Sequence, residues 1–196
     1  MCALVCVPLL AVLASGCGGG NTVKGERQDK DEPSGTFKVD VVSASFPAKQ
    51  HLARQARMVV EVRNADNRTI PNLAVTVEPG FTSRSNRQDL ADPNRPIWIV
   101  DDGPIGGGTA YTNTWALGAL KAGETRRFVW KVTPVRPGSH EVRFRVAAGL
   151  AGKAKAQGQD GKAAEGSFEV KITDKPSQAT VDPETGKVIR DDGDTK

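Results

Sequence analysis

Apolar and polar residues alternate with a period of two through most of the chain between residues 36 and 174. In residues 126–132, for example, Phe128 and Trp130 alternate with Arg127 and Lys131. A period of two gives a β-strand one buried face and one solvated face, as in half-buried antiparallel sheets. The segments that carry this pattern are 36–42, 57–64, 72–79, 126–132, 140–147 and 167–173. No segment of comparable length has a helical period with capping residues, so the pattern predicts an all-β protein.

The number of strands predicts two sheets around one core. About seven strands in a domain of this size form an antiparallel β-sandwich. The 21 glycines and 12 prolines among 196 residues agree with a chain that turns often. The alternation changes phase after Val41, because Ala44 and Phe46 continue the apolar face, and this change predicts a β-bulge near Val42.

Three segments do not fit a minimal sandwich. Residues 80–118 exceed the loop length of about 12–15 residues above which loops tend to be functional, and they include a predicted short strand at 97–100. Residues 149–166 are rich in Lys, Ala and Gly and are predicted to be a flexible hairpin tip. The polar tail at 175–196 is compatible with a short hairpin docked on the body or with a disordered tail.

The N-terminal segment predicts export. Residues 3–14 are apolar or small over about a dozen positions, which is short for a transmembrane helix of about 20 residues and suits the apolar core of a signal peptide. No Lys or Arg precedes this segment. The three cysteines, Cys2, Cys6 and Cys17, all lie within the first 17 residues, so the rest of the chain has no disulfide framework.

Residues 13–17, Leu-Ala-Ser-Gly-Cys, resemble the lipobox of bacterial lipoproteins. The resemblance implies cleavage after residue 16 and a diacylglycerol on the Cys17 thiol, which would anchor the chain to a membrane. Residues 17–35 would then be the lipidated cysteine and a flexible linker, because they are mostly glycine and charged residues. The alternative is that Cys17 is a free cysteine in an uncleaved apolar anchor.

A second resemblance concerns residues 36–174. Leu120, Gly123-Glu124, the alternating strand at 128–132 and Pro137-Gly138 look like the closing half of the cell-adhesion-related immunoglobulin-like domains of bacterial surface proteins. Residues 59–77, with Asn64 at a turn, look like the earlier strand pair of those domains. The resemblance implies an immunoglobulin-like antiparallel β-sandwich of about seven strands, preceded by a disordered tether, that has no enzymatic activity.

The sequence offers little for catalysis or cofactors. His51 and His140 lack the spacing of metal ligands, no cysteine follows Cys17, and Gly106–Gly108 lacks the Lys and Ser or Thr of a phosphate-binding loop. Asp101-Asp102-Gly103 and residues 191–194 are interpreted as solvated turns rather than calcium sites. The net charge of +4 is too small to indicate nucleic-acid binding without a basic motif. We therefore expect no catalytic residue, metal or cofactor.

Two binding surfaces are predicted instead. If residues 126–132, 140–147 and 167–173 lie in one sheet, its solvated face carries five cations that suit anionic phospholipids or phosphate-bearing wall polymers: Arg127, Lys131, Arg143, Arg145 and Lys171. The alternative is a solvated face whose cations pair with interleaved carboxylates such as Glu141 and Glu169. The second predicted surface is a set of aromatic residues that bind a partner or cap the core: Phe81, Trp98, Tyr111 and Trp115.

These observations predict an exported lipoprotein on the extracytoplasmic side of a bacterial membrane. Its β-sandwich would be a non-catalytic binding or structural module of the cell envelope. Its partners would be the membrane, through the lipid anchor, and an anionic lipid, a wall polymer or another envelope protein. The alternative is an envelope enzyme or enzyme accessory protein that uses residues 80–118 as a substrate loop; a solute-binding component of a transporter would need a larger, two-lobed body.

Overall fold

The computed structural model describes residues 32–83, 96–175 and 178–191. Within these ranges the chain forms strands and no helix, so they contain no helix that is long and apolar enough to cross a membrane. The strands are β1 (Gly35–Ser45), β2 (Lys49–His51), β3 (Ala56–Asn64), β4 (Ala74–Glu78), β5 (Phe81–Ser83), β6 (Trp98–Asp102), β7 (Thr114–Ala116), β8 (Thr125–Pro134), β9 (Gly138–Ala147), β10 (Ala154–Gln157), β11 (Glu165–Thr173), β12 (Gln178–Val181) and β13 (Val188–Asp191).

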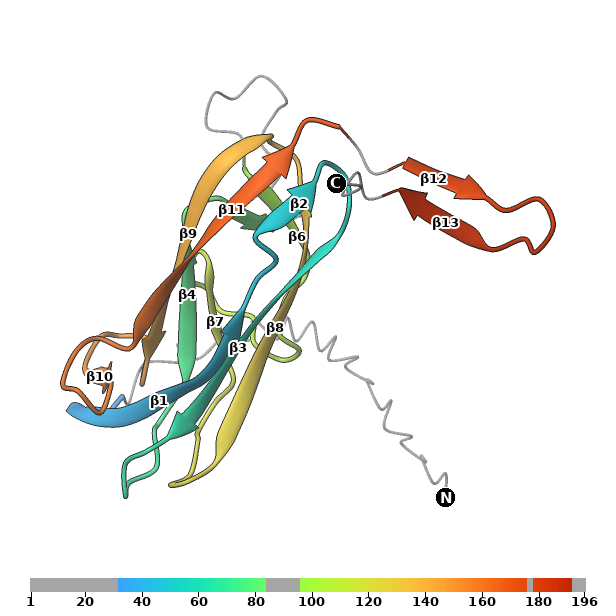
Figure 1. Cartoon of the computed structure of the whole chain (residues 1–196). Coiled ribbons are helices and arrows are strands. Elements are labelled where there is room, and N and C mark those ends of the chain that lie inside the picture. The colour runs from blue at the N-terminus through green and yellow to red at the C-terminus, as the bar shows by residue number, and fades with distance from the viewer. Residues whose placement is uncertain (1–31, 84–95, 176–177, 192–196) are drawn as a thin grey trace, which may run out of the picture.

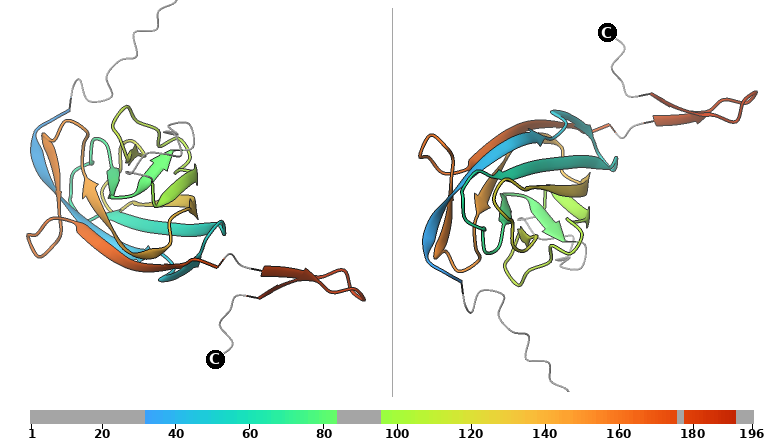
Figure 2. Two further views of the ribbon diagram at one scale, coloured as in Figure 1. Left: turned by 90° about the horizontal axis from the view of Figure 1, so that it is seen from above. Right: turned by 90° about the horizontal axis from the view of Figure 1, so that it is seen from below.

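Two sheets pack face to face to form a β-sandwich (Figure 1, Figure 2). The six-stranded sheet has the order β10-β1-β3-β8-β6-β5, and the five-stranded sheet has the order β2-β11-β9-β4-β7. The all-β sandwich predicted from the alternation is therefore confirmed. The sheets contain more than the predicted seven strands because β2, β5, β7 and β10 are only three or four residues long, which is too short to show an alternating pattern.

The inward side chains of both sheets form one hydrophobic core. On β8, Phe128, Trp130 and Val132 are fully buried, whereas Arg127 and Lys131 are exposed, as the alternation predicts. The predicted bulge is also present, since the pairing of β1 with β3 shifts register between Val41 and Ser43. Burial of each large apolar side chain contributes about 1.5–3 kcal/mol, so this core is the main source of stability.

An aromatic cluster joins the two sheets at one end of the core. The ring of Trp98 on β6 contacts Phe46 at 5.4 Å and Phe81 at 5.6 Å between ring centres. Its indole N–H donates a buried hydrogen bond of 2.7 Å to Oε1 of Gln50 on β2. Because β6 and β2 belong to different sheets, this hydrogen bond links the sheets through the core.

The segment predicted to be a flexible hairpin tip, residues 149–166, contains strand β10. The first four residues of β1 pair with β10 in parallel, from Gly35 opposite Ala154 to Lys38 opposite Gln157. Ala154 is buried in the core. The prediction of a wholly flexible tip is wrong because an edge strand needs backbone pairing and only small apolar side chains, and neither gives a strong hydrophobic pattern.

The predicted linker ends earlier than residue 35. The carboxylate of Glu32 accepts hydrogen bonds from the backbone N–H groups of Leu150, Ala151 and Ala154, at 2.5, 2.6 and 2.8 Å. Partial burial by itself raises the pKa of Glu32, but these backbone donors together hold the pKa of its carboxyl below the ordinary value. The carboxylate thus fastens the start of the body to the segment that leads into β10.

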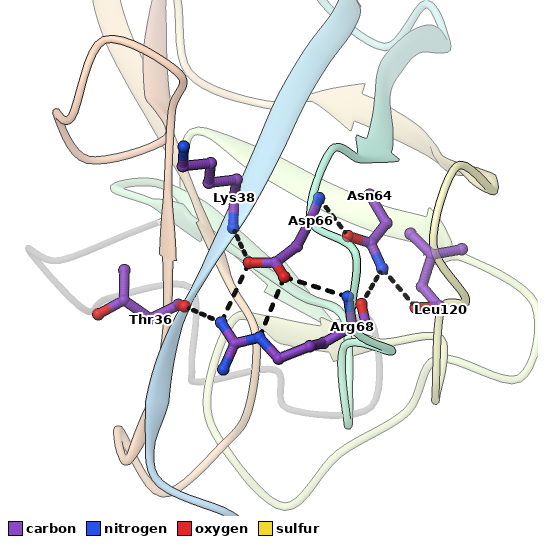
Figure 3. Close-up of polar contacts among 6 residues, drawn as sticks. All are labelled: Thr36, Lys38, Asn64, Asp66, Arg68 and Leu120. Atoms are coloured by element: carbon purple, nitrogen blue, oxygen red, sulfur yellow. Dashed lines mark hydrogen bonds and ion pairs between the residues drawn. The ribbon is translucent and has the colours of Figure 1, made fainter.

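The side chain of Asn64, at the end of β3, connects two loops of the sandwich (Figure 3). Its buried side-chain amide donates hydrogen bonds of 2.8 Å to the backbone oxygens of Arg68 and Leu120, and its Oδ1 accepts one of 2.9 Å from the N–H of Asp66. The amide therefore ties the loop after β3 to the loop before β8. The turn position that the sequence suggests for Asn64 has this physical basis.

The carboxylate of Asp66 continues the network toward β1 (Figure 3). It accepts hydrogen bonds from the guanidinium of Arg68 and from the backbone N–H of Lys38. The guanidinium also donates to the backbone oxygen of Thr36 and lies 4.5 Å from the ring centre of Phe37. The hydrogen bonds from Arg68 keep the pKa of Asp66 well below its usual range. Asp66 and Arg68 thus hold the first part of β1 beside the loop.

The C-terminal tail contains a hairpin, a structure that the sequence left open beside a disordered tail. β12 and β13 pair in antiparallel register from Gln178 opposite Asp191 to Val181 opposite Val188. They form a two-stranded sheet that is separate from both sheets of the sandwich (Figure 1).

Replacement of Asn64 should reveal the strength of the loop network. Asn64→Ala removes both buried N–H donors and leaves the two carbonyl acceptors without this partner, so we expect a loss of about 2–3 kcal/mol in the free energy of unfolding, measured by urea denaturation. Asn72→Ala is the control, because the Asn72 side chain accepts one exposed hydrogen bond from Gly118 N–H and should cost less than about 1 kcal/mol. Equal losses in the two variants would contradict the assigned role of Asn64.

The stability that the Glu32 carboxylate contributes should depend on pH. A carboxyl whose pKa is lowered in the folded state contributes stability above its unfolded pKa, and that contribution is lost as the pH falls through the folded pKa. Glu32→Gln should therefore be less stable than wild type at pH 7, and the difference should shrink as the pH falls below about 4.3. Urea denaturation from pH 7 to pH 3 measures it; Glu184→Gln, on the exposed turn of the hairpin, is the control and should show no such trend.

Candidate functional site

The structure divides the five predicted basic residues between the two sheets. Arg127 and Lys131 lie on β8 in the six-stranded sheet, whereas Arg143 and Arg145 on β9 and Lys171 on β11 lie in the five-stranded sheet. The expectation of a single basic face is therefore wrong. The reason is that residues 135–137 carry the chain from one sheet to the other, so that β8 and β9 do not pair with each other.

Carboxylates pair with the two arginines of this set that lie on β9. Arg143 pairs with Glu141 at 2.8 Å and Arg145 pairs with Glu165 at 3.3 Å. Glu78 lies directly opposite Arg143 on the neighbouring strand β4. The hydrogen bond from Arg143 lowers the pKa of Glu141, although both side chains are exposed and such pairs contribute little stability. The predicted alternative, a solvated face with ion pairs, describes this sheet.

The six-stranded sheet carries a groove of about 760 Å³ beside β8. We call it the β8 groove. One wall is β8 itself and the other is the turn that follows β6, and Leu117 also lines the groove. The groove is lined by Asp102, Gly103, Pro104, Ile105, Gly106, Leu117, Thr125, Arg126, Arg127, Val129 and Lys131. Two of the five predicted basic residues, Arg127 and Lys131, therefore belong to it.

A tight turn builds the outer wall of the β8 groove. Gly107 N–H donates a hydrogen bond of 2.9 Å to the backbone oxygen of Pro104, and Gly106 has a φ of +74°. A turn with positive φ at its third position favours glycine there. Ile105, at the second position, is 99% exposed. The fold thus presents a large apolar side chain to solvent on a hydrogen-bonded turn.

Positive charge lines the inner wall of the β8 groove. Lys131 forms an ion pair of 3.0 Å with Asp102 on the facing edge. Arg126 and Arg127 form no ion pair within the described part of the chain, although Arg127 lies opposite Glu61 on β3. Asp102 is the one carboxylate in the lining of the groove, so the groove has an excess of cations. It suits a ligand that is both anionic and partly apolar.

The predicted aromatic surface is not a surface in this structure. Phe81 and Trp98 are 1% and 0% exposed and belong to the core, so a partner cannot reach them. Trp115 is half-buried and packs edge-on against Trp130 at 5.5 Å between ring centres. Tyr111 alone among the four is exposed. The aromatic set therefore serves mainly to fill and cap the core, the second of the two roles predicted for it.

The aspartates near the end of β6 are engaged in hydrogen bonds. Asp101 accepts hydrogen bonds from Thr133 at 2.5 Å and Gln55 at 3.2 Å, while Asp102 pairs with Lys131. Across residues 32–83, 96–175 and 178–191, no three His, Cys, Asp or Glu residues come together as potential metal ligands. Cys17 and residues 192–194 lie outside the described residues, as does the 84–95 part of the long insertion.

Sequence reasoning missed Ile105 and the wall that presents it. The available signal is an isolated large apolar residue between Pro104 and three glycines, in a segment where turns normally carry polar residues. The strand pattern does not reveal the groove, because alternation says which face of β8 is solvated but not where its neighbouring strand ends.

Comparison with known proteins gives a likeness in fold. No protein-family model and no curated protein sequence matches the chain. Among solved structures, the CARDB domain of a Pyrococcus furiosus protein, crystallised in complex with di-metal ions, is 15% identical, with a TM-score of 0.44 over 72% of this chain and 92% of that one. Alpha-2-macroglobulin from Escherichia coli is 12% identical, with a TM-score of 0.43 over 74% of this chain and 18% of that one.

A core role for Trp98 can be tested by a single substitution. Trp98→Phe leaves Oε1 of buried Gln50 without its donor and removes part of the aromatic cluster, so we expect a loss of about 2 kcal/mol in the free energy of unfolding. Trp115→Phe is the control, since Trp115 is half-buried and its indole N–H has no hydrogen-bond partner among the described residues; it should cost about 1 kcal/mol. Unchanged stability of Trp98→Phe, measured by thermal denaturation, would contradict the core assignment.

Proposed function

We propose that the protein is a lipid-anchored protein of the bacterial cell envelope whose β-sandwich is a non-catalytic binding module, with the β8 groove as its binding surface. The observation that carries the binding role is Ile105, which is fully exposed on a hydrogen-bonded turn beside a row of cations. A groove that combines apolar side chains with an excess of cations is a feature of binding sites.

The proposed anchor rests on the sequence around Cys17. The apolar segment, the small residues before the cysteine and the glycine-rich segment after it agree with export, lipidation and a tether. Each buried CH₂ group of an acyl chain contributes about 0.8 kcal/mol to membrane binding, and two chains anchor a protein firmly. A body that begins at Glu32 would then lie within about 50 Å of the membrane, the extended length of residues 17–31.

The chemistry of the β8 groove supports binding rather than catalysis. Its ionisable side chains are three cations and Asp102, and Asp102 is paired with Lys131. An acid–base mechanism needs a group that is positioned to accept a proton, and the one carboxylate of the lining, Asp102, is engaged in the ion pair with Lys131. The groove therefore has the means to hold an anionic partner and lacks an evident general base.

Substitution of Cys17 tests the anchor. We expect wild type and the matched control Cys6→Ser to incorporate radiolabelled palmitate and to partition into the detergent phase of a Triton X-114 extract. Cys17→Ser should lose the label and migrate more slowly on a denaturing gel, because lipidation precedes cleavage of the signal peptide in lipoproteins. Label, migration and partitioning of Cys17→Ser that match wild type would refute the anchor.

A further inference from the structure

We propose that the free edge of β8 binds an extended, carboxylate-bearing peptide segment, which joins the six-stranded sheet as an additional strand. This inference rests on the proposed function and deepens it, because it names the class of partner and the way it is held. Three observations carry it: the backbone direction of β8, the early end of β6, and the charge and apolar side chains of the β8 groove.

The backbone of β8 directs the N–H and C=O groups of alternate residues to opposite neighbours, as in any antiparallel strand. On the β3 side, the oxygen of Pro134 accepts a hydrogen bond from Ala53 N–H. On the β6 side, Val135 N–H donates to the oxygen of Ile97. Even-numbered residues of β8 therefore face β3, and odd-numbered residues, including Arg127 and Val129, direct their backbone groups toward the β8 groove.

No strand of the described chain covers this side of β8 ahead of Lys131. β6 pairs with β8 only between Trp98 opposite Pro134 and Asp102 opposite Lys131, and the chain then leaves the sheet in the turn at 104–107. In Figure 1, β6 accordingly lies beside only the upper part of β8. The backbone groups of Arg127 and Val129 that face the groove are therefore an unpaired edge, which is a template for another strand.

The side chains around this edge indicate the chemistry of the added strand. In such a strand, alternate side chains point to opposite faces. Ile105, Leu117 and Val129 offer apolar contacts, while Arg126 and Arg127 supply positive charge that no carboxylate of the groove neutralises. A peptide that alternates apolar and acidic residues satisfies both requirements.

The groove also has the dimensions for such a segment. Its volume of about 760 Å³ falls within the range of about 300–1,000 Å³ that is typical of ligand sites. The edge between Thr125 and Val129 accommodates about five residues of a strand at about 3.3 Å each. An anionic lipid headgroup would use the cations alone and would leave the backbone edge unpaired, so the two occupants differ in their dependence on backbone hydrogen bonds.

The test uses the full chain and a fluorescent, terminally blocked octapeptide that alternates valine and glutamate, with binding measured by fluorescence anisotropy. Two analogues are N-methylated, one at every valine and the other at every glutamate. Only one set of N–H groups faces β8 in a paired strand, so we expect one analogue to lose at least tenfold in affinity and the other to lose less. The inference would be overturned if both analogues bound as tightly as the parent peptide, or if the parent peptide did not bind.

Protein variants locate the binding edge. Val129→Pro removes an N–H that faces the groove while leaving the β3 ladder intact, and Arg127→Glu reverses a groove cation; each should weaken peptide binding at least tenfold. Arg57→Glu is the matched control, because Arg57 lies opposite Lys131 on the same sheet but does not line the groove, and it should change affinity less than threefold. Equal losses in Arg57→Glu and Arg127→Glu would overturn the assignment to the groove. If Val129→Pro does not fold, the N-methylated peptides still decide the question.

A vesicle assay separates the alternative occupant. Binding of the full chain to phosphatidylglycerol vesicles that Arg127→Glu abolishes, together with no binding of the peptide, would assign the groove to a lipid surface and overturn the peptide inference. The vesicle assay uses the Cys17→Ser variant, so neither vesicle binding nor peptide binding depends on lipidation of Cys17. Failure of this inference is thus distinguishable from failure of the anchor, which the palmitate label reports.

Discussion

Every strand of the sandwich buries one face in a shared core, and the other features of the structure depend on this burial. Trp98, Trp130, Phe81 and Phe128 are its largest fully buried side chains, and they come from the six-stranded sheet. Because these rings reach across to the five-stranded sheet, with Trp98 bonded to Gln50, they fix how the two sheets face each other. The outer faces and edges are then free to vary, since they carry little of the stabilising burial.

The two outer faces show how similar residues acquire different roles. Arg143 and Arg145 stand among carboxylates on their own and neighbouring strands, so their charge is neutralised locally. Arg127 has one carboxylate opposite it, Glu61, without an ion pair, and an adjacent unpaired edge. Arg143 thus has an ion-pair partner on its own strand, whereas Arg127, although it lies opposite Glu61, stands beside an open backbone edge.

Much of the architecture followed from the sequence because the alternation is strong in the long strands. The buried positions of β8 and β9 and the bulge near Val42 were predictable, since side-chain period and phase are local properties. The assignment of strands to sheets was not predictable, because alternation identifies the buried face of a strand and not the strand it pairs with. The wrong prediction of a single basic face followed from this. β10 was missed because Ala154 and Ala156 give a weak apolar signal. The choice between a surface and a core role for Trp98 was left open because its short strand interrupts a long polar insertion. The β8 groove depends on where β6 ends, which is a tertiary property.

The hydrogen bonds of Glu32 have a mechanical consequence. A pull on the chain from its N-terminal side reaches the folded body first at this carboxylate, where three backbone donors from residues 150–154 share the load. The next element in line is the parallel pairing of β1 with β10, ahead of the longer ladder between β1 and β3. Under tension the body would thus yield first at this edge, where the first four residues of β1 place one large side chain, Phe37, in the core.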